Sequence, residues 1–261
     1  MDQTSLDNYT ESEIQKLQRV ENSVYRQILG APRYAQTAAL RGEIGSSSMA
    51  SRIIGNQIQY VQYIETNKGE RNELLKRILQ ERKEFKNDYW ITSLKDNVGH
   101  VVEDYKLLKT LSRDQLKKKI QDWDTRMWQE ELCQKSSLKI YRSWKKNIKG
   151  EEKLYDNRPA SVILFKGRTN NLQLNDRKRH SGGDVTCDLC GAAVKNLNHF
   201  LLWCKTYTEE RSMEPLLQQP YSEDEDQLIG RLLFEEDCVT EIKNFLYKIW
   251  RKREKLRREA Q

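Results

Sequence analysis

Three cysteines and one histidine lie close together in the stretch CDLCGAAVKNLNHFLLWC, which runs from Cys187 to Cys204. Two residues separate Cys187 and Cys190, the spacing of a tight turn that points both sulfurs at one ion. Gly191 follows directly and can take the positive φ that such a turn often needs. His199 and Cys204 complete the set. Because tetrahedral zinc prefers thiolate and imidazole ligands, we predict a zinc site at Cys187, Cys190, His199 and Cys204.

The number of ligands also predicts the role of the ion. Four protein ligands leave no open coordination position, so the zinc is expected to be structural and not catalytic. Asn196 can cap a short helix that carries His199 in its first turn. His199 and Cys204 are five residues apart, and in an ideal helix this offset turns them about 140° away from each other. Cys204 is therefore expected where this helix ends and unwinds. The alternative is three buried thiols beside a core histidine.

The other cysteines and histidines lie outside this spacing. Cys133 and Cys238 are predicted to pack in the core, and neither His100 nor His180 is expected to bind the metal. The five cysteines are unevenly spaced along the chain, which does not suggest a disulfide framework. The start, MDQTSLDNYT, has neither a basic region nor an apolar core, which indicates an intracellular protein of the nucleus or cytoplasm. No apolar run approaches the roughly 20 residues that cross a bilayer, so no membrane contact is expected.

The elements that must position the cluster are predicted to be helices. The chain has only 4 prolines, and its apolar residues recur at helical spacing. Thr10 and Glu13 can form a capping box that opens the first helix, and Gly30 with Pro32 can end it. Ser112 is a predicted N-cap further along the chain.

Apolar stripes at helical spacing follow one another along the chain, and we predict that they form the core. They comprise Ile14, Leu17, Val20, Val24, Tyr25 and Ile28; Ile53, Ile54, Ile58, Val61 and Ile64; Leu74, Leu75, Ile78 and Leu79; Leu116, Ile120, Trp123 and Met127; Leu138, Tyr141, Trp144 and Ile148; Leu228, Ile229, Leu232 and Leu233, with Ser222 and Glu225 as a possible cap; and Val239, Ile242, Phe245, Leu246 and Ile249. Gly150 and the turn at 156–159 mark the predicted domain boundary. The expected fold is mainly α, with a helical region at 1–150 and a second region at 151–261.

The charge is unevenly placed. The net charge is +7, and Lys and Arg are in large excess from Lys135 to His180 and again from Arg251 to Arg258. The segment from Tyr221 to Asp237 is acidic. Basic segments of this kind favour a polyanionic partner, and the alternative is that they are simply solvated helix faces.

The cysteine motif, taken with two upstream segments, resembles a known family. CDLCGAAVKNLNHFLLWC resembles the Cys-Cys-His-Cys motif at the C-terminal end of the reverse transcriptases of non-LTR (LINE-type) retrotransposons. KLQRVENSVYRQILGAPRYAQTAAL is similar to the start of their thumb, after the palm, and the segment from SSLKIYRSW to NNLQLN is similar to their basic connector. The resemblance implies a helical thumb-like bundle, then a zinc knuckle and C-terminal helices.

The departures from that family concern catalysis. Its polymerases need an Asp-Asp turn and a further aspartate to hold two metal ions, and no such pair occurs here. SEDEDQ lies past the knuckle in the wrong context. A nuclease pattern of Pro-Asp followed by Asp-x-Lys is also absent after Cys204. The chain is therefore not expected to be an enzyme.

The resemblance implies a C-terminal fragment or domesticated remnant that binds nucleic acid, expected to be RNA. Trp203 could stack on an unpaired base or pack against Leu197 or the last helix. The expected phosphate contacts are Arg177, Lys178 and Arg179, and more weakly Lys166 and Arg168.

Two other interpretations remain open. One is a helical protein-interaction module with a purely structural zinc, whose partner surface would be the C-terminal amphipathic helix and its basic end. The other is a decaying transposon copy without selected function.

Overall fold

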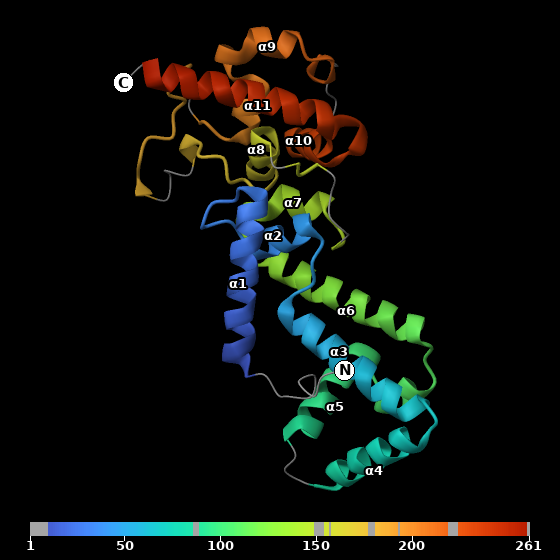
Figure 1. Cartoon of the computed structure of the whole chain (residues 1–261). Helices are drawn as coiled ribbons and strands as arrows, with labels where there is room; N and C mark the ends of the chain where they lie inside the picture. Colours follow the sequence, from blue (N-terminus) through green and yellow to red (C-terminus); the bar gives the residue numbers. More distant parts are fainter. Residues whose placement is uncertain are drawn as a thin grey trace. The chain divides into compact units, whose positions relative to one another are not determined.

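The computed structural model describes residues 10–85, 89–148, 154–156, 158–176, 181–192, 194–218 and 224–259 (Figure 1). These residues form helices and connecting loops without any strand, so the predicted mainly α fold is confirmed. None of the described helices is both long and apolar enough to cross a membrane. The helices are α1 (Glu11–Leu29), α2 (Thr37–Ile44), α3 (Met49–Thr66), α4 (Glu70–Glu84), α5 (Tyr89–Val102), α6 (Arg113–Cys133), α7 (Lys139–Trp144), α8 (Pro159–Arg168), α9 (Thr208–Ser212), α10 (Glu225–Phe234) and α11 (Glu236–Glu259).

Side-chain caps begin several of these helices as predicted. The Thr10 backbone N–H donates to Glu13 Oε2 at 2.8 Å, and the Glu13 N–H donates to Thr10 Oγ1 at 3.3 Å. The same reciprocal pair joins Ser112 and Gln115 at the start of α6. These bonds satisfy backbone donors that have no partner inside the helix. α1 ends before Gly30, whose φ of 57° suits glycine.

The chain divides into two compact units. Unit 1 comprises Met1–Glu21 and Ser47–Glu130, and unit 2 comprises Asn22–Ser46 and Glu131–Gln261. The divisions fall inside α1, between α2 and α3, and inside α6, so the two units differ from the segments 1–150 and 151–261 that the sequence predicts. A change of unit within a continuous helix leaves no proline, glycine or change in composition to reveal it.

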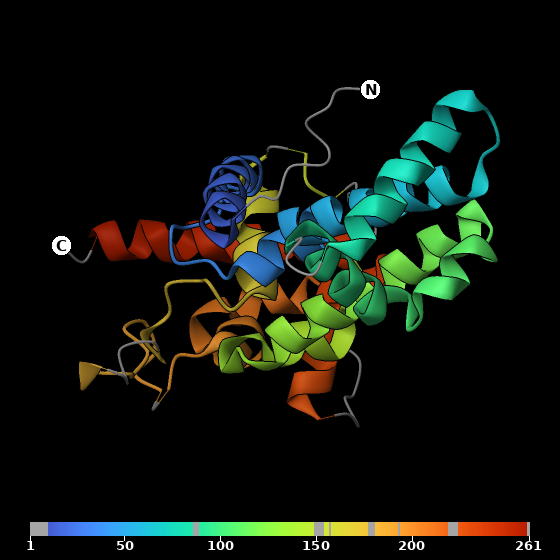
Figure 2. The same cartoon turned by 90° about the horizontal axis from the view of Figure 1, so that it is seen from below.

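Unit 1 has an apolar core built by α3, α5 and α6. Ile58 and Val61 of α3 pack with Leu94 and Val98 of α5, and Leu116 of α6 joins them. α4 lies beside α3 (Figure 2). The predicted stripe of α3 therefore contributes directly to this core.

One polar network accompanies the core of unit 1. The Glu65 carboxylate accepts hydrogen bonds from Lys83 Nζ at 2.9 Å and from the Tyr105 hydroxyl at 3.2 Å. Lys109 Nζ lies 3.0 Å from the same carboxylate. These bonds join α3, α4 and the turn that follows α5.

Unit 2 has its core where α8, α10 and α11 pack together (Figure 1). The predicted stripe of α11 is buried there, from Val239 to Ile249, and that of α10 is buried with it. Cys238 is also buried, as predicted. The N-cap of α10 is Asp224, whereas the cap predicted at Ser222 lies outside the described residues.

The prediction that every apolar stripe is core is wrong for α1. Leu17, Val20, Val24 and Ile28 are exposed, Val20 by 66%. Tyr25 is the buried residue of this predicted stripe, and α1 also buries Asn22 and Leu29, which lie outside the stripe. Helical spacing reveals an apolar face, but it does not say whether the chain supplies a partner for that face.

Smaller parts of the core prediction are also wrong. Leu74 and Ile78 of α4 and Met127 of α6 are exposed. Cys133 is exposed as well, because it is the last residue of α6 and lies beyond the buried Leu132.

Candidate metal centre

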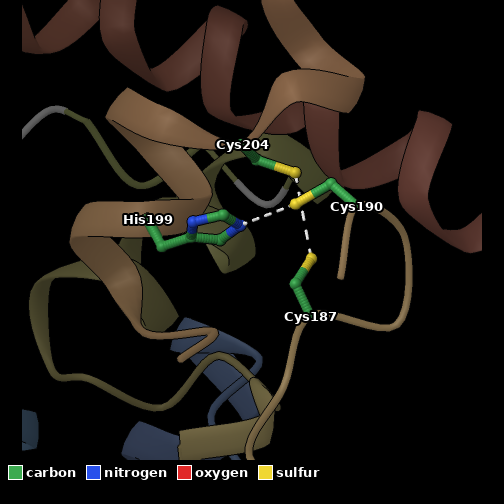
Figure 3. A group of neighbouring side chains, drawn as sticks. All are labelled: Cys187, Cys190, His199 and Cys204. Carbon is green, nitrogen blue, oxygen red and sulfur yellow. Dashed lines mark hydrogen bonds between the residues drawn. The ribbon is translucent and has the colours of Figure 1, made fainter. Parts of the chain in front are cut away.

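A tight turn positions the first two cysteines. The Cys187 backbone N–H donates to Ala192 O at 2.8 Å, and the Gly191 N–H donates to Cys187 O at 2.9 Å. Gly191 has a φ of 73°, as its place after the second cysteine predicts. The turn thereby brings the Cys187 and Cys190 side chains to one side of the loop (Figure 3).

A π-helical turn, η5 (His199–Trp203), positions the other two ligands. Asn196 Oδ1 accepts the His199 N–H at 2.8 Å, so the predicted cap is present. The Cys204 N–H donates to His199 O at 2.7 Å, a bond that spans five residues. This wider turn brings residues five apart closer in angle than the about 140° of an ideal α-helix. The helix ends at Cys204, as predicted.

The four side chains converge on one point (Figure 3). Their ligand atoms all lie within 4.8 Å of one another. The sulfurs of Cys187 and Cys204 are 3.9 Å apart, and Cys190 Sγ is 3.4 Å from His199 Nε2. A tetrahedral zinc ion with bonds of about 2.3 Å to sulfur and about 2.0 Å to nitrogen requires separations of about 3.8 and 3.5 Å. The cluster is therefore close enough to hold a metal ion and has dimensions compatible with zinc.

Backbone donors surround the sulfurs. Burial opposes ionisation of Cys190, but hydrogen bonds, first from the Ala192 backbone, outweigh it and lower the pKa of this thiol. Burial raises the pKa of Cys204 to about 11, although Thr206 donates hydrogen bonds to its sulfur. Burial, followed by the positive charges of Lys195 and Arg211, lowers the pKa of His199. A neutral imidazole is the form that binds a metal.

Ion pairs hold the loop between Cys187 and Cys190 in place. Asp188 forms an ion pair with Lys195, whose side chain is fully buried. The same carboxylate lies 3.3 Å from Nε of Arg257 in α11. The sequence gives no sign of these partners, because such ion pairs have no characteristic spacing.

The prediction that Arg168 contacts phosphate is wrong. Its guanidinium Nη1 lies 2.7 Å from Glu43 Oε2, and the two side chains are 1% and 0% exposed. Arg168 Nε also donates to Leu233 O at 2.7 Å. The last turn of α8 faces the core of unit 2, so a basic residue there forms an internal ion pair and cannot reach a ligand.

The other predicted contact residues have varied positions. Lys166 is partly exposed on α8. Trp203 is 55% exposed, and its indole N–H donates to Glu225 Oε1 at 2.9 Å. Its ring is therefore not buried in the core. Arg177, Lys178 and Arg179 lie outside the described residues, as does His180.

The C-terminal helix is not an open apolar surface. Its apolar residues lie in the core of unit 2, so the predicted partner surface is reduced to the basic end of α11, where Arg251, Lys255 and Arg258 are exposed. His100 is exposed in unit 1 and is no part of the cluster. No protein-family model, no curated protein and no solved structure matches this chain.

Proposed function

We propose that this chain is a nucleic-acid-binding protein whose C-terminal part is organised by a structural zinc ion. The observation that carries the proposal is the convergence of Cys187, Cys190, His199 and Cys204 within 4.8 Å. Three soft sulfurs and one imidazole favour zinc over harder cations. Four protein ligands leave no position for a substrate, so the ion would stabilise the fold and take no part in chemistry.

The charge of the surface supports a polyanionic partner. The predicted phosphate contacts Arg177, Lys178 and Arg179 precede the cysteine cluster in the chain, and Lys166 is partly exposed. Trp203 immediately precedes the ligand Cys204 and has an exposed ring that can stack on an unpaired base. The motif resemblance favours RNA and an origin in a LINE-type retrotransposon, and we propose both on that ground.

A salt titration tests this proposal. Single-stranded RNA binding should fall with log salt by about 0.7 per phosphate contacted. Replacing Arg177, Lys178 and Arg179 together with Gln should flatten the slope by about 2 and weaken binding to unrelated sequences equally. Trp203→Ala should instead cost about 1–3 kcal/mol with the slope unchanged.

A matched control comes from unit 1. Lys117, Lys118 and Lys119 form another run of three basic residues, on α6. Replacing them with Gln removes the same charge and should leave the slope unchanged. Equal flattening in both triple variants would mean that only bulk charge matters. An unchanged slope in the first variant, with zinc retained, would exclude the phosphate contacts.

A second function is favoured by the exposed apolar face of α1. Leu17, Val20, Val24 and Ile28 form a contiguous stripe, and such stripes mark contact surfaces for other proteins. In that case the chain is a protein-interaction module with a structural zinc, and RNA binding is absent at physiological salt. Polymerase and nuclease activities are not part of either proposal, because the sequence has neither an Asp-Asp pair nor, after Cys204, a Pro-Asp and Asp-x-Lys pattern.

A further inference from the structure

Two buried hydrogen-bond donors beside the Cys-His cluster have no partner among the described residues. They are Nη1 of Arg211 and the hydroxyl of Tyr207. A buried donor without a partner costs about 1–3 kcal/mol, so native structures rarely retain one without a reason. Both residues follow Cys204 closely in the chain, where a short 3₁₀ turn (Lys205–Tyr207) leads into α9.

Arg211 is held against the last metal ligand. Its Nη2 donates to Cys204 O at 2.6 Å, which anchors one side of the guanidinium. No carboxylate forms an ion pair with Arg211 in the described part of the chain, and its neighbour Glu210 is paired with Lys252 instead. Arg211 is therefore a partly buried cation without an ion-pair partner. Burial lowers the pKa of its guanidinium, and the negative groups that oppose this are Cys204, Glu210 and Cys190.

Tyr207 is held next to the same ligand from within the core. Its side chain is fully buried, its N–H donates to Cys204 O at 3.1 Å, and its ring packs edge-on against Phe200. Its hydroxyl is a buried donor in the segment that follows this ligand, without a partner among the described residues.

The negative charge of a zinc-bound centre indicates which atoms could accept hydrogen bonds from these two donors. One zinc ion and three thiolates leave one unit of negative charge in a largely buried site. The other cation beside the cluster, Lys195, is already paired with Asp188. Outer groups that hydrogen-bond to metal ligands hold them in place and tune the metal.

We propose that Arg211 and Tyr207 form an outer shell of the metal centre, in which Arg211 Nη1 and the Tyr207 hydroxyl donate hydrogen bonds to the cysteine sulfurs. Arg211 also supplies the counterion of the loaded site. This inference rests on the proposed zinc site. Both are positioning residues, because neither is a ligand of the ion.

Zinc affinity of the full chain tests the proposal, measured by competition with a chromophoric chelator. Arg211→Met and Tyr207→Phe should each weaken zinc binding about 10-fold or more. Arg211→Lys keeps the charge and should lose less zinc affinity than Arg211→Met. With Co²⁺ as the probe, Arg211→Met and Tyr207→Phe should shift the sulfur-to-cobalt charge-transfer band to longer wavelength, because a thiolate without donors gives up its electrons more easily.

Matched controls separate this role from general stability. Tyr141 is a fully buried tyrosine whose hydroxyl donates to Ala39 O at 3.4 Å. Arg142 donates to the carbonyl of Cys133, outside the cluster, at 3.1 Å. Tyr141→Phe and Arg142→Met should leave both the affinity and the cobalt band unchanged.

The outcomes are distinguishable. Affinities within about twofold of wild type in Arg211→Met and Tyr207→Phe, with an unshifted band, overturn the outer shell while the zinc site stands. Equal losses in the controls overturn it as well, since the effect would then be one of stability. A wild-type chain that binds no zinc overturns the metal centre and this inference together.

Discussion

Unit 1 and unit 2 are both helical, but they bury different groups. The core of unit 1 is formed by apolar residues of long helices, and its buried amide Gln62 is satisfied by the backbone oxygens of Leu108 and Leu111. Unit 2 buries the Arg168–Glu43 pair, Lys195 and Arg253, together with the cysteine cluster. Between α8 and α10 its chain has little regular helix. A segment with few backbone hydrogen bonds of its own depends on cross-links, by charge or by metal.

Loss of the metal should have the largest effect, and it should affect unit 2 and not unit 1. Metal binding can contribute about 10–16 kcal/mol to the folding of a zinc module. Cys190→Ser or His199→Ala should therefore unfold the region after Asp184 and leave α3 and α5 folded. Hydrogen exchange read by mass spectrometry checks this, together with the metal content. Metal near zero in the native wild-type chain would refute the prediction.

Removal of one charge from the buried pair of unit 2 should have the next largest effect. Glu43→Ala leaves Arg168 buried without its counterion, which typically costs about 3–5 kcal/mol. Urea unfolding of unit 2, monitored by hydrogen exchange, should shift accordingly, whereas unit 1 and the zinc content should not change. The double variant Glu43→Leu with Arg168→Met should recover most of the loss, and no recovery would contradict the ion-pair explanation.

The charged network of unit 1 should have a smaller effect that depends on pH. Burial opposes ionisation of Glu65, but hydrogen bonds from Lys83 and Lys109 outweigh it and lower its pKa. The stabilisation is therefore complete above the unfolded pKa of about 4.3 and is lost as the pH falls through the lowered folded value. Glu65→Gln should lower the free energy of unfolding of unit 1 by about 1–2 kcal/mol at pH 7 and should make this free energy depend less on pH in acid. An unchanged dependence on acid pH would contradict this.

The smallest effect should come from the exposed stripe of α1. Val24→Ser should change the free energy of unfolding by less than about 0.5 kcal/mol, because Val24 is already exposed to solvent. For comparison, Leu246→Ala in α11 should lower the free energy of unfolding by about 2–5 kcal/mol, because Leu246 is fully buried. Denaturant unfolding compares the two variants. A large loss for Val24→Ser would mean that this face is covered in solution.

The sequence predicted most of the helices, because their caps and apolar periods are local. Thr10 with Glu13 and Ser112 with Gln115 act within one turn, and Gly30 ends α1 through its own backbone. The cysteine cluster was also predictable, since Cys187, Cys190, His199 and Cys204 lie in one short segment whose spacing limits how far apart they can be.

Tertiary structure decided which groups became partners. Arg168 and Trp203 were both predicted to contact nucleic acid, yet one is buried against Glu43 and the other is exposed. α1 and α11 have similar apolar stripes, and only that of α11 is buried along its whole length. Burial and ion pairing depend on residues far away in the chain, such as Glu43 for Arg168, and local spacing carries no information about them. The sequence by itself determined the helices and the cysteine cluster, whereas packing between distant segments determined burial and pairing.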